Sequence, residues 1–414
     1  MADAARDPGA PPLRILIVVT AFPKLSETFV LDHALGLAAL GHDVTVLSRG
    51  PAPEALRHAR YDAERACLRE IAYEHSGRVA SRLALARGLV ACLWRRPLAT
   101  LRFLRDRPLP GGREVLLAAA ALASCPRYDV VHAHFGPTGL LVARLRDLGL
   151  LTAARTFTSF HGYDVGSFAQ TYGSAAYRPL WQSEMVAIAN GGDIARRLLD
   201  LGAAPERVAV VPIGVAAAPA HVARPQADVG TAPRLLSIGR FVEKKGHAFG
   251  LHAFARVAER HPGARYALIG GGPLEAPLRA LAAELGIAER VEFHGASDDA
   301  TVAALLAHAD LLVTPSVTAT DGDREGMVVA NMEAMARGLA VVATRHAAIP
   351  ELVLEGETGL LCDERDVAGL AAAIERLVAD SALRATLGAA GRERVARHFS
   401  LAEHVRRLVL LYRA

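Results

Sequence analysis

The feature that most constrains the fold is a regular alternation of short apolar runs with stretches of helical pattern. The first run is RILIVV (Arg14 to Val19), which has the length and continuous apolar character of a buried strand. Ser26 then offers an N-cap for a helix that extends to about Leu40, where Gly41 ends it. The apolar run HDVTVLSR follows at once. A strand, a helix and a strand in this order form a βαβ unit, which predicts a parallel sheet.

The same alternation returns in both halves of the chain, on either side of one interruption. The further runs are YDVVHAHF, FTSFHGYD, MVAIAN and RVAVVPIG in the first half, and RLLSIGR, ARYALIGGG, VEFHG, ADLLVTPS and AVVATR in the second. Between them, residues 215–233 lack an apolar period and have the Ala- and Pro-rich composition of a linker. The sequence therefore predicts an α/β protein with two Rossmann-like, doubly wound domains, 14–214 and 234–398. Because such sheets bind ligands beyond the carboxyl ends of their strands, we expect the domains to face each other across a cleft.

Two shorter segments flank these domains. Residues 1–13 are small, polar and Pro-rich, which predicts a disordered tail. Ser400 and Glu403 have the spacing of a capping box. This spacing predicts a C-terminal helix within 399–414 that could pack back on the N-terminal domain.

Composition narrows the classes of function. Hydrophobic residues make up 52% of the 414 residues, and a net charge of +4 is too small and too dispersed to indicate a nucleic acid partner. The four cysteines form no CxxC motif, so we expect buried, reduced thiols. The chain starts without a basic segment followed by an apolar one, and its longest apolar run, Val115 to Cys125, is too short to span a bilayer. We therefore expect a cytoplasmic protein.

Neither half begins with the glycine pattern of a dinucleotide site. The segment after the first strand is TAFPKLSETF, and the segment after the first strand of the second half is GRFVEKKG, so an NAD enzyme is disfavoured. Gly270 and Gly271 follow another strand, where a tight turn is favoured over a phosphate cradle. Arg240 and Lys245 lie at a predicted strand end, where they could bind a phosphate. A solvated basic turn that includes Lys244 is the alternative interpretation.

The segment DGDREGMVVANMEAMARG (321–338) contains two glutamates eight positions apart. In one helix, Glu325 and Glu333 would be about 12 Å apart, which suits the two ends of an extended ligand better than a shared hydrolytic task. We predict that a helix begins near Gly326, so that Glu325 lies just before it and Glu333 about two turns in. The unpaired amides of a helix start suit a diphosphate.

These residues together resemble a known family. Arg240 with Lys245, the E-x7-E pair Glu325 and Glu333, and the segment IPELVLEGETGLL (349–361) are similar to the retaining glycosyltransferases of family 4, which have the GT-B fold. FPKLSETF and SFHGYDV further resemble the branch with colanic-acid-type exopolysaccharide transferases. The resemblance covers nearly the whole chain.

The resemblance implies a role for each matching residue. Arg240 and Lys245 would hold the donor's diphosphate, with Glu325 binding the donor sugar, Glu333 the ribose, and His161 lying over the sugar. The turn and helix start would complete the nucleotide site, through Gly270, Gly271, Gly326, Met327 and Val328, and His294 would shape the base pocket. The family implies retention of anomeric configuration, a β-phosphate oxygen that takes the acceptor's proton, and no divalent metal or other cofactor. The co-substrate would be a UDP- or GDP-type sugar.

The acceptor side departs from the family pattern. Lys24, Ser26 and Glu27 stand where many members have paired glycines, and we assign them, with His134, to the acceptor side as a hypothesis. We expect His132 and His134 to point to opposite faces of their strand, with no further ligand nearby. This placement favours a cleft-lining or structural role over zinc.

The segment from Arg78 to Arg113 carries nine arginines and one acidic residue, Asp106, interleaved with leucines and Trp94. One interpretation is a peripheral contact with an anionic membrane, which would favour a polyprenyl-linked saccharide acceptor. The other is a solvated helix pair that covers the N-terminal sheet.

For function, we expect a hexosyltransferase of surface polysaccharide or glycolipid synthesis. The alternatives are a transferase acting on a soluble small molecule and a silent sugar-nucleotide-binding protein.

Overall fold

The computed structural model describes residues 11–51, 59–74, 78–106, 111–123, 127–217 and 233–414. The chain divides into two compact units. The N-terminal unit comprises Met1–Asn190, Ile194–Val211 and His404–Ala414, and the C-terminal unit comprises Gly191–Asp193 and Pro212–Glu403. Each unit is built around one parallel sheet, and each is described below by itself.

The N-terminal unit has a seven-stranded sheet in the order β3-β2-β1-β4-β5-β6-β7. All of its strand pairs are parallel. The strands are β1 (Arg14–Val18), β2 (Asp43–Ser48), β3 (Arg69–Ala72), β4 (Tyr128–His134), β5 (Ala153–Phe160), β6 (Val186–Ala189) and β7 (Val208–Val210). The direction of strand succession reverses between β1 and β4. The carboxyl ends of these two strands are therefore the expected place for a ligand.

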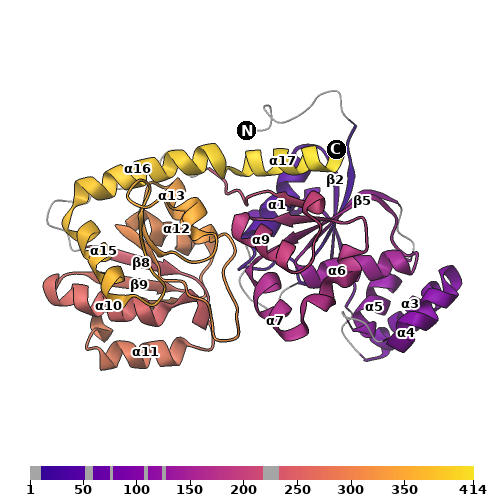
Figure 1. Ribbon diagram of the computed structural model, residues 1–414, viewed down its shortest axis with the longest axis horizontal. Coiled ribbons are helices and arrows are strands. Elements are labelled where there is room, and N and C mark those ends of the chain that lie inside the picture. Colours follow the sequence, from indigo (N-terminus) through magenta and orange to yellow (C-terminus); the bar gives the residue numbers. More distant parts are fainter. Residues whose placement is uncertain (1–10, 52–58, 75–77, 107–110, 124–126, 218–232) are drawn as a thin grey trace. The chain divides into compact units, whose positions relative to one another are not determined.

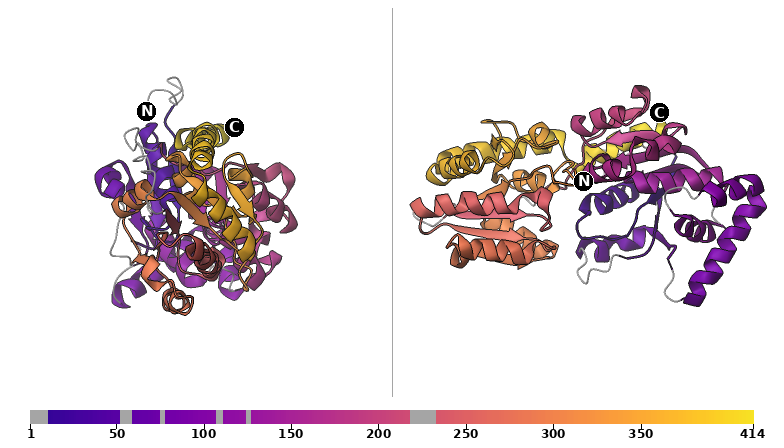
Figure 2. Two further views of the ribbon diagram at one scale, coloured as in Figure 1. Left: turned by 90° about the vertical axis from the view of Figure 1, so that its left-hand side faces the viewer. Right: turned by 60° about the horizontal axis from the view of Figure 1, so that its bottom comes forward.

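Helices cover both faces of this sheet, as they must when both faces are apolar. The helices are α1 (Thr28–Ala39), α2 (Ala59–Glu64), α3 (Arg78–Arg95), α4 (Pro97–Asp106), α5 (Gly112–Leu122), α6 (Gly136–Asp147), α7 (Ala169–Tyr172), α8 (Arg178–Trp181), most of α9 (Gly192–Asp200) and most of α17 (Leu401–Arg413). One apolar cluster joins Leu16, Val131 and Leu141 to α5. Outside α5, helices α3 and α4 form a further layer (Figures 1 and 2).

The C-terminal unit has a six-stranded parallel sheet in the order β10-β9-β8-β11-β12-β13. Its strands are β8 (Arg234–Ile238), β9 (Arg265–Ile269), β10 (Val291–Gly295), β11 (Leu311–Thr314), β12 (Ala340–Thr344) and β13 (Leu360–Cys362). Its helices are α10 (His247–Arg260), α11 (Glu275–Glu284), α12 (Asp299–His308), α13 (Val329–Ala336), α14 (Ile349–Leu352), α15 (Val367–Ala379) and α16 (Ser381–His398). Here the strand order reverses between β8 and β11.

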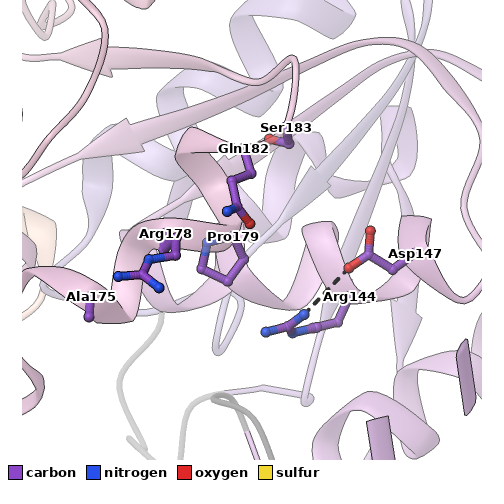
Figure 3. A pocket seen from close by; sticks show the side chains of 7 residues that line it. All are labelled: Arg144, Asp147, Ala175, Arg178, Pro179, Gln182 and Ser183. Atoms are coloured by element: carbon purple, nitrogen blue, oxygen red, sulfur yellow. Dashed lines mark hydrogen bonds and ion pairs between the residues drawn. The ribbon is translucent and has the colours of Figure 1, made fainter. Parts of the chain in front are cut away.

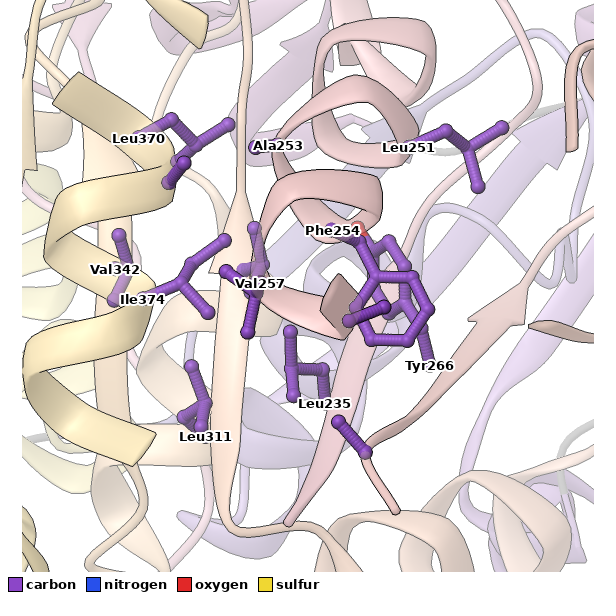
Figure 4. Packing of buried hydrophobic residues seen from close by; sticks show 14 of the residues in the cluster. Leu235, Leu251, Ala253, Phe254, Val257, Tyr266, Leu311, Val342, Leu370 and Ile374 are labelled. Carbon is purple, nitrogen blue, oxygen red and sulfur yellow. The ribbon is translucent and has the colours of Figure 1, made fainter. Parts of the chain in front are cut away.

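The core of this unit lies between the sheet and helices α10, α11 and α15. Phe254 and Val257 of α10 pack on Leu235 of β8 and Leu311 of β11, and Ile374 of α15 closes the same cluster (Figure 4). All five side chains are almost fully buried. This packing fixes β8 and β11 side by side, so the loops that follow them emerge together at the carboxyl edge.

Several local predictions differ from the structure. The edge strands β3 and β13 were not predicted, because each has only three or four residues and β3 is largely exposed. The cap of α1 is Glu27 rather than Ser26, without a side-chain hydrogen bond. Val215, the first residue of the predicted linker, pairs with Ser400 in an isolated bridge. Most of that linker and residues 1–10 of the predicted tail lie outside the described residues.

Other local predictions are confirmed. Ser400 Oγ accepts a hydrogen bond from the Glu403 amide at 3.3 Å, and helix α17 follows. The described cysteines are free, and Cys92 and Cys362 are buried as predicted, but the prediction of burial is wrong for Cys67, which is exposed. None of the helices in the described part of the chain is both long and apolar enough to span a bilayer.

Candidate active site

The loops after β8 and β9 are held together by their backbones. The Phe241 amide donates to the Gly271 carbonyl at 2.9 Å, and the Gly270 amide donates to the Gly295 carbonyl at 2.8 Å. A Cβ on Gly270 would lie 1.9 Å from the Gly239 carbonyl oxygen, so no larger residue fits. The glycine run is therefore a site of close loop packing, beside the segment that carries Arg240.

A second close approach joins the loops after β8 and β11. Gly246 has a φ of 63°, and a Cβ on it would lie 1.8 Å from the carbonyl oxygen of Pro315. Glycine is the residue that adopts this conformation without steric cost. The contact places Lys245 next to the β11 loop, where the sheet reverses.

Lys245 and Glu325 form the central ion pair of this edge. The Nζ of Lys245 lies 2.8 Å from Oε1 of Glu325, and the two side chains are 17% and 8% exposed. Burial alone would raise the pKa of Glu325, but Lys245 and then Lys244 lower it below the usual value. Glu325 is therefore an anion in the folded protein at neutral pH. Arg240 is exposed, and none of the described residues pairs with its guanidinium.

Two side chains that were not predicted, those of His346 and Ser316, contact Glu325, and Glu364 holds His346 in turn. The Glu325 amide donates to Nε2 of His346 at 3.1 Å, so Nδ1 of His346 carries the proton and donates to Oε1 of Glu364 at 2.6 Å. Ser316 Oγ donates to the Glu325 carboxylate at 3.3 Å. His346 and Glu364 lie far from Glu325 in the sequence and belong to no motif that would reveal this contact.

The loop before Glu325 corrects the interpretation of Lys244 as part of a solvated turn. Lys244 is buried and donates to Oδ1 of Asp323 and to the carbonyl of Arg324, both at 3.0 Å. Asp323 Oδ1 also accepts from the Arg324 amide, and Asp321 Oδ1 accepts from the Asp323 amide. Lys244 and the two aspartates thus shape the loop that presents Glu325.

Helix α13 begins at Val329, three residues later than predicted. Glu325 therefore lies well before the helix, and Glu333 is its fifth residue, about one turn in rather than two. Within the described part of the chain, no group accepts from the amides of Gly326, Met327 or Val328. These three donors follow Glu325 directly in the chain. His294 is exposed on edge strand β10, with Nε2 3.4 Å from the Glu292 carboxylate.

In the N-terminal unit, His161 follows β5 at the carboxyl edge and is almost fully buried. Its amide donates to Oδ2 of Asp164 at 2.7 Å. Asn190 Nδ2 lies 3.3 Å from Nδ1 of His161, so Nδ1 accepts and Nε2 carries the proton. That Nε2–H has no partner among the described residues. Burial and His404 lower the pKa of His161 to about 3, so the ring is neutral.

The acceptor-side residues share this edge. The Nζ of Lys24 contacts Glu27 Oε1 at 2.5 Å, and Ser26 is exposed beside them. His134 ends β4 and stacks on His161 with ring centroids 5.8 Å apart. The structure therefore brings His134 and His161 together.

The prediction that His132 and His134 point to opposite faces of their strand, with no further ligand nearby, is wrong. Residues i and i+2 of a strand share a face, and the two rings stack with centroids 4.9 Å apart. A further histidine is also close, since Nδ1 of His33 lies 2.8 Å from Nε2 of His134. Ring nitrogens of the three histidines lie within 4.8 Å of one another.

Comparison with known proteins identifies the family to which this chain belongs. Residues 26–218 match the family described as Glycosyltransferase Family 4, and residues 223–394 match Glycosyl transferases group 1. A putative colanic acid biosynthesis glycosyltransferase of Salmonella typhimurium is 34% identical over 87% of this chain and 89% of that protein. The chain belongs to glycosyltransferase family 4. An amylovoran biosynthesis glycosyltransferase of Erwinia amylovora is 30% identical to this family 4 transferase over 88% of this chain and 90% of that protein.

Solved structures confirm the GT-B fold of the transferase. HepE of Anabaena, solved in complex with UDP-glucose, superposes with a TM-score of 0.72 at 18% identity, over 96% of this chain and 99% of that one. A sucrose-phosphate synthase from Thermosynechococcus elongatus gives 0.71 at 22% identity, over 96% and 98%. At these identities the likeness establishes the fold.

The transferase also has a cavity of about 370 Å³ away from these residues (Figure 3). Arg144 and Asp147 line it from the end of α6, and Arg178 and Ser183 line it from the segment before β6. The end of α6 and the start of β6 belong to the amino edge of the sheet. Because ligands of such sheets bind at the carboxyl edge, this cavity is not the candidate site.

Proposed function

We propose that this transferase moves a hexose from a nucleoside diphosphate sugar to a hydroxyl of a saccharide acceptor, with retention of anomeric configuration and without a divalent metal. The observation that carries the proposal is that Arg240 and Lys245 follow β8, the three amides follow Glu325 in the loop after β11, and these neighbouring strands are joined there by the Lys245–Glu325 pair. The names of the colanic acid and amylovoran relatives support synthesis of a bacterial surface polysaccharide. The complex of HepE with UDP-glucose supports a donor of that type.

Positive charge for the diphosphate comes from this edge. Lys245 has three N–H donors and gives one to Glu325, which leaves two for phosphate oxygens. Arg240 can bind a second phosphate bidentately, and the amides of Gly326, Met327 and Val328 add neutral donors at a helix start. Such preorganised donors stabilise the charge that develops on a departing nucleotide.

The carboxylates of Glu325 and Glu333 are proposed to bind the two ends of the donor, the sugar and the ribose. Oε1 of Glu325 accepts from Lys245 and Ser316, whereas Oε2 has no donor in the described part of the chain. Oε2 can therefore accept from hydroxyls of the donor sugar. Glu333, one turn into α13, is assigned to the ribose. Asp321 and Asp323 are engaged with loop amides and Lys244, which supports a metal-independent reaction.

A direct assay tests this function. We expect the purified protein to transfer labelled hexose from one of UDP-glucose, UDP-galactose, GDP-mannose or ADP-glucose to a panel of octyl hexosides, with equal rates in EDTA. The product should keep the donor's anomeric configuration, measured by proton NMR coupling constants. Nucleotide binding with neither transfer nor donor hydrolysis would favour the silent binding protein. Loss of activity in EDTA that one added metal restores would refute the metal-free mechanism.

We also propose that helices α3 and α4 rest on an anionic membrane, which would give access to a lipid-linked acceptor. These helices expose a set of large apolar side chains, which comprises Val79, Leu83, Val90, Leu93, Trp94, Leu98, Leu101 and Leu104. Trp94 alone is 88% exposed. Arg82, Arg87 and Arg102 are exposed on the same helices, without an acidic partner among the described residues. Apolar groups that insert and arginines that pair with lipid phosphates are typical of an interfacial surface.

Vesicle binding tests this surface. We expect the protein to cosediment with vesicles that contain phosphatidylglycerol and to bind phosphatidylcholine vesicles far less. The double variant Trp94→Ser/Leu101→Ser should lower binding at least tenfold, because each buried large side chain contributes about 1.5–3 kcal/mol. Leu410→Ser, at another exposed leucine, is the matched control and should bind normally. Equal binding by the double variant and the control would contradict the proposal.

A further inference from the structure

The N-terminal unit has a second cavity, of about 420 Å³, at the carboxyl edge of its sheet. Its lining comes from the residue that follows β2, from the first turns of α5 and α6, and from the segment after β5 that continues into α7 (Figure 1). Such sheets bind their ligands at this edge, in contrast to the amino edge where the cavity of Arg144 lies. The volume falls within the range of about 300–1,000 Å³ that is typical of small-molecule sites.

The walls of this cavity are fixed by hydrogen bonds and close packing. Asp164 Oδ1 accepts from the Gly136 amide at 3.1 Å, which ties the start of α6 to the segment before α7. The Tyr177 hydroxyl donates to the Asp164 carbonyl at 2.9 Å, and a Cβ on Gly136 would lie only 2.4 Å from that hydroxyl. The backbone amide and carbonyl of Arg49 are also hydrogen-bonded, each at 3.0 Å. The cavity is therefore largely preformed, as ligand sites usually are.

Two aromatic rings form part of the lining. The ring centroids of Phe168 and Tyr172 are 4.7 Å apart, with the ring planes tilted by 44°. Phe168 is buried and supports Tyr172, which is 50% exposed. Pro137 and Leu140 add apolar surface from the first turn of α6. An exposed aromatic face attracts the C–H groups on one face of a sugar ring, because the face of the aromatic ring carries partial negative charge.

The polar lining contains two arginines, each of which already has a carboxylate partner. Nη2 of Arg49 contacts Oε1 of Glu114, and Nη1 of Arg113 lies 3.0 Å from Oε1 of Glu74. The charges of these four side chains therefore cancel. Oε2 of Glu114 has no partner within the described ranges of the chain, and the guanidinium of Arg49 has five N–H donors, more than its carboxylate partner can use. Adjacent donors and acceptors of this kind match sugar hydroxyls, which both donate and accept.

The pairing of its charges distinguishes this cavity from the edge of the C-terminal unit that we assign to the diphosphate. There, none of the described residues pairs with the Arg240 guanidinium, so its positive charge is available to an anion. A phosphate in the cavity of the N-terminal unit would lie beside the carboxylate of Glu114 or would have to displace it from Arg49. An uncharged ligand with hydroxyl groups meets neither cost. The cavity therefore suits a neutral sugar better than a phosphate.

We propose that this cavity binds an uncharged sugar unit of the acceptor chain, one that does not itself react. One face of the sugar ring stacks on Tyr172, and neighbouring hydroxyls donate to Glu114 and accept from Arg49. The identification of this ligand as part of the acceptor rests on the proposed transfer reaction, whereas its binding requires neither donor nor turnover. The cavity makes the enzyme prefer an acceptor of two or more sugar units over a single hexose.

Saturation-transfer NMR on the full chain without donor tests this binding. The probes are the methyl glycosides of glucose, galactose and mannose, and the disaccharides cellobiose, maltose and lactose. We expect the wild type to bind at least one probe, Tyr172→Phe to bind it equally because the ring remains, and Tyr172→Ala to bind it at least tenfold more weakly. The matched control is Arg178→Ala, at an exposed residue of the amino-edge cavity in the same unit, and it should bind like the wild type.

Because Tyr172 and Arg178 are both exposed, neither variant should change the unfolding temperature. The absence of binding by the wild type for every probe would overturn the proposal, as would equal binding by Tyr172→Ala and Arg178→Ala. Competition identifies the class of ligand. Inorganic phosphate, UDP and geranyl phosphate should not displace the bound sugar. Displacement by phosphate or UDP would indicate an anion site and displacement by geranyl phosphate a lipid site, and either result contradicts the proposal.

Transfer kinetics link the cavity to the acceptor. With the preferred donor, Tyr172→Ala should raise the KM for an octyl disaccharide at least tenfold and leave kcat and the KM for an octyl monosaccharide unchanged. A lower kcat with both acceptors would contradict a role in binding a sugar unit that does not react. Sugar binding at Tyr172 without any transfer would refute the transfer reaction and leave the cavity as a saccharide site. Transfer by a wild type whose sugar binding survives in Tyr172→Ala would refute the site alone.

Discussion

Lys245→Met is expected to destabilise the C-terminal unit by about 3–5 kcal/mol and to lower glycosyl transfer at least tenfold. The stability loss arises because Glu325, only 8% exposed, would keep a buried charge without its ion-pair partner. Lys244 remains nearby but is committed to Asp323 and the Arg324 carbonyl. The transfer loss follows from the proposed role of Lys245 in binding the diphosphate of the donor. Calorimetry and the transfer assay measure the two effects separately.

The double variant Lys245→Met/Glu325→Gln distinguishes stability from chemistry. It removes both buried charges, so we expect it to recover much of the lost stability and none of the lost transfer. The matched control is Arg260→Met, which breaks an ion pair of the same 2.8 Å length in the same unit. Because Arg260 is exposed, this control should unfold and transfer like the wild type. A double variant that is less stable than both single variants would show that the pair is not the source of the loss.

The sequence predicted the sheet architecture because buried parallel strands are marked by continuous apolar runs. It failed for β3 and β13, which are short strands at the sheet edges and contact a neighbour on one side alone. It also placed the start of α13 too early, since Gly326, Met327 and Val328 fit a helix or a turn equally well. The family motif assigned Lys245 and Glu325 to one donor site, but neither the motif nor any pattern in the apolar residues predicted the ion pair that they form.

Buried polar contacts were the least predictable part of the candidate site. Nε2 of His33 lies 3.0 Å from the Tyr412 hydroxyl, although the two residues are 379 positions apart and no periodicity relates them. The two-residue period of a strand is enough to predict that His132 and His134 share a face, but the prediction placed them on opposite faces. Lys244 looks like a surface residue in the sequence, yet the loop that folds over it accepts both of its hydrogen bonds.

Acidification is the second large effect that we expect. His33, His132, His134 and His161 are buried in the N-terminal unit, and burial is the first cause that lowers the pKa of each. Below pH 6.5 the unfolded chain binds protons that the folded unit excludes, so stability falls as pH falls. Each such histidine then costs about 1.4 kcal/mol per pH unit. Four together remove about 5 kcal/mol between pH 7.5 and 5.5, which is comparable to the whole stability of an ordinary domain.

Tryptophan fluorescence isolates this effect, because both tryptophans, Trp94 and Trp181, belong to the N-terminal unit. Urea titrations followed at this signal should give a free energy of unfolding that declines steeply from pH 7 to pH 5. His161→Asn should reduce that slope by about one proton, since one excluded proton is lost. Tyr266→Phe, in the other unit, should leave the slope unchanged.

The lowered pKa of Glu325 cannot produce this decline, because an acid with a depressed pKa loses its contribution to stability only below its ordinary pKa of 4.5. A flat profile between pH 7 and 5 would mean that the four rings accept protons in the folded state, contrary to the burial that lowers the pKa of each.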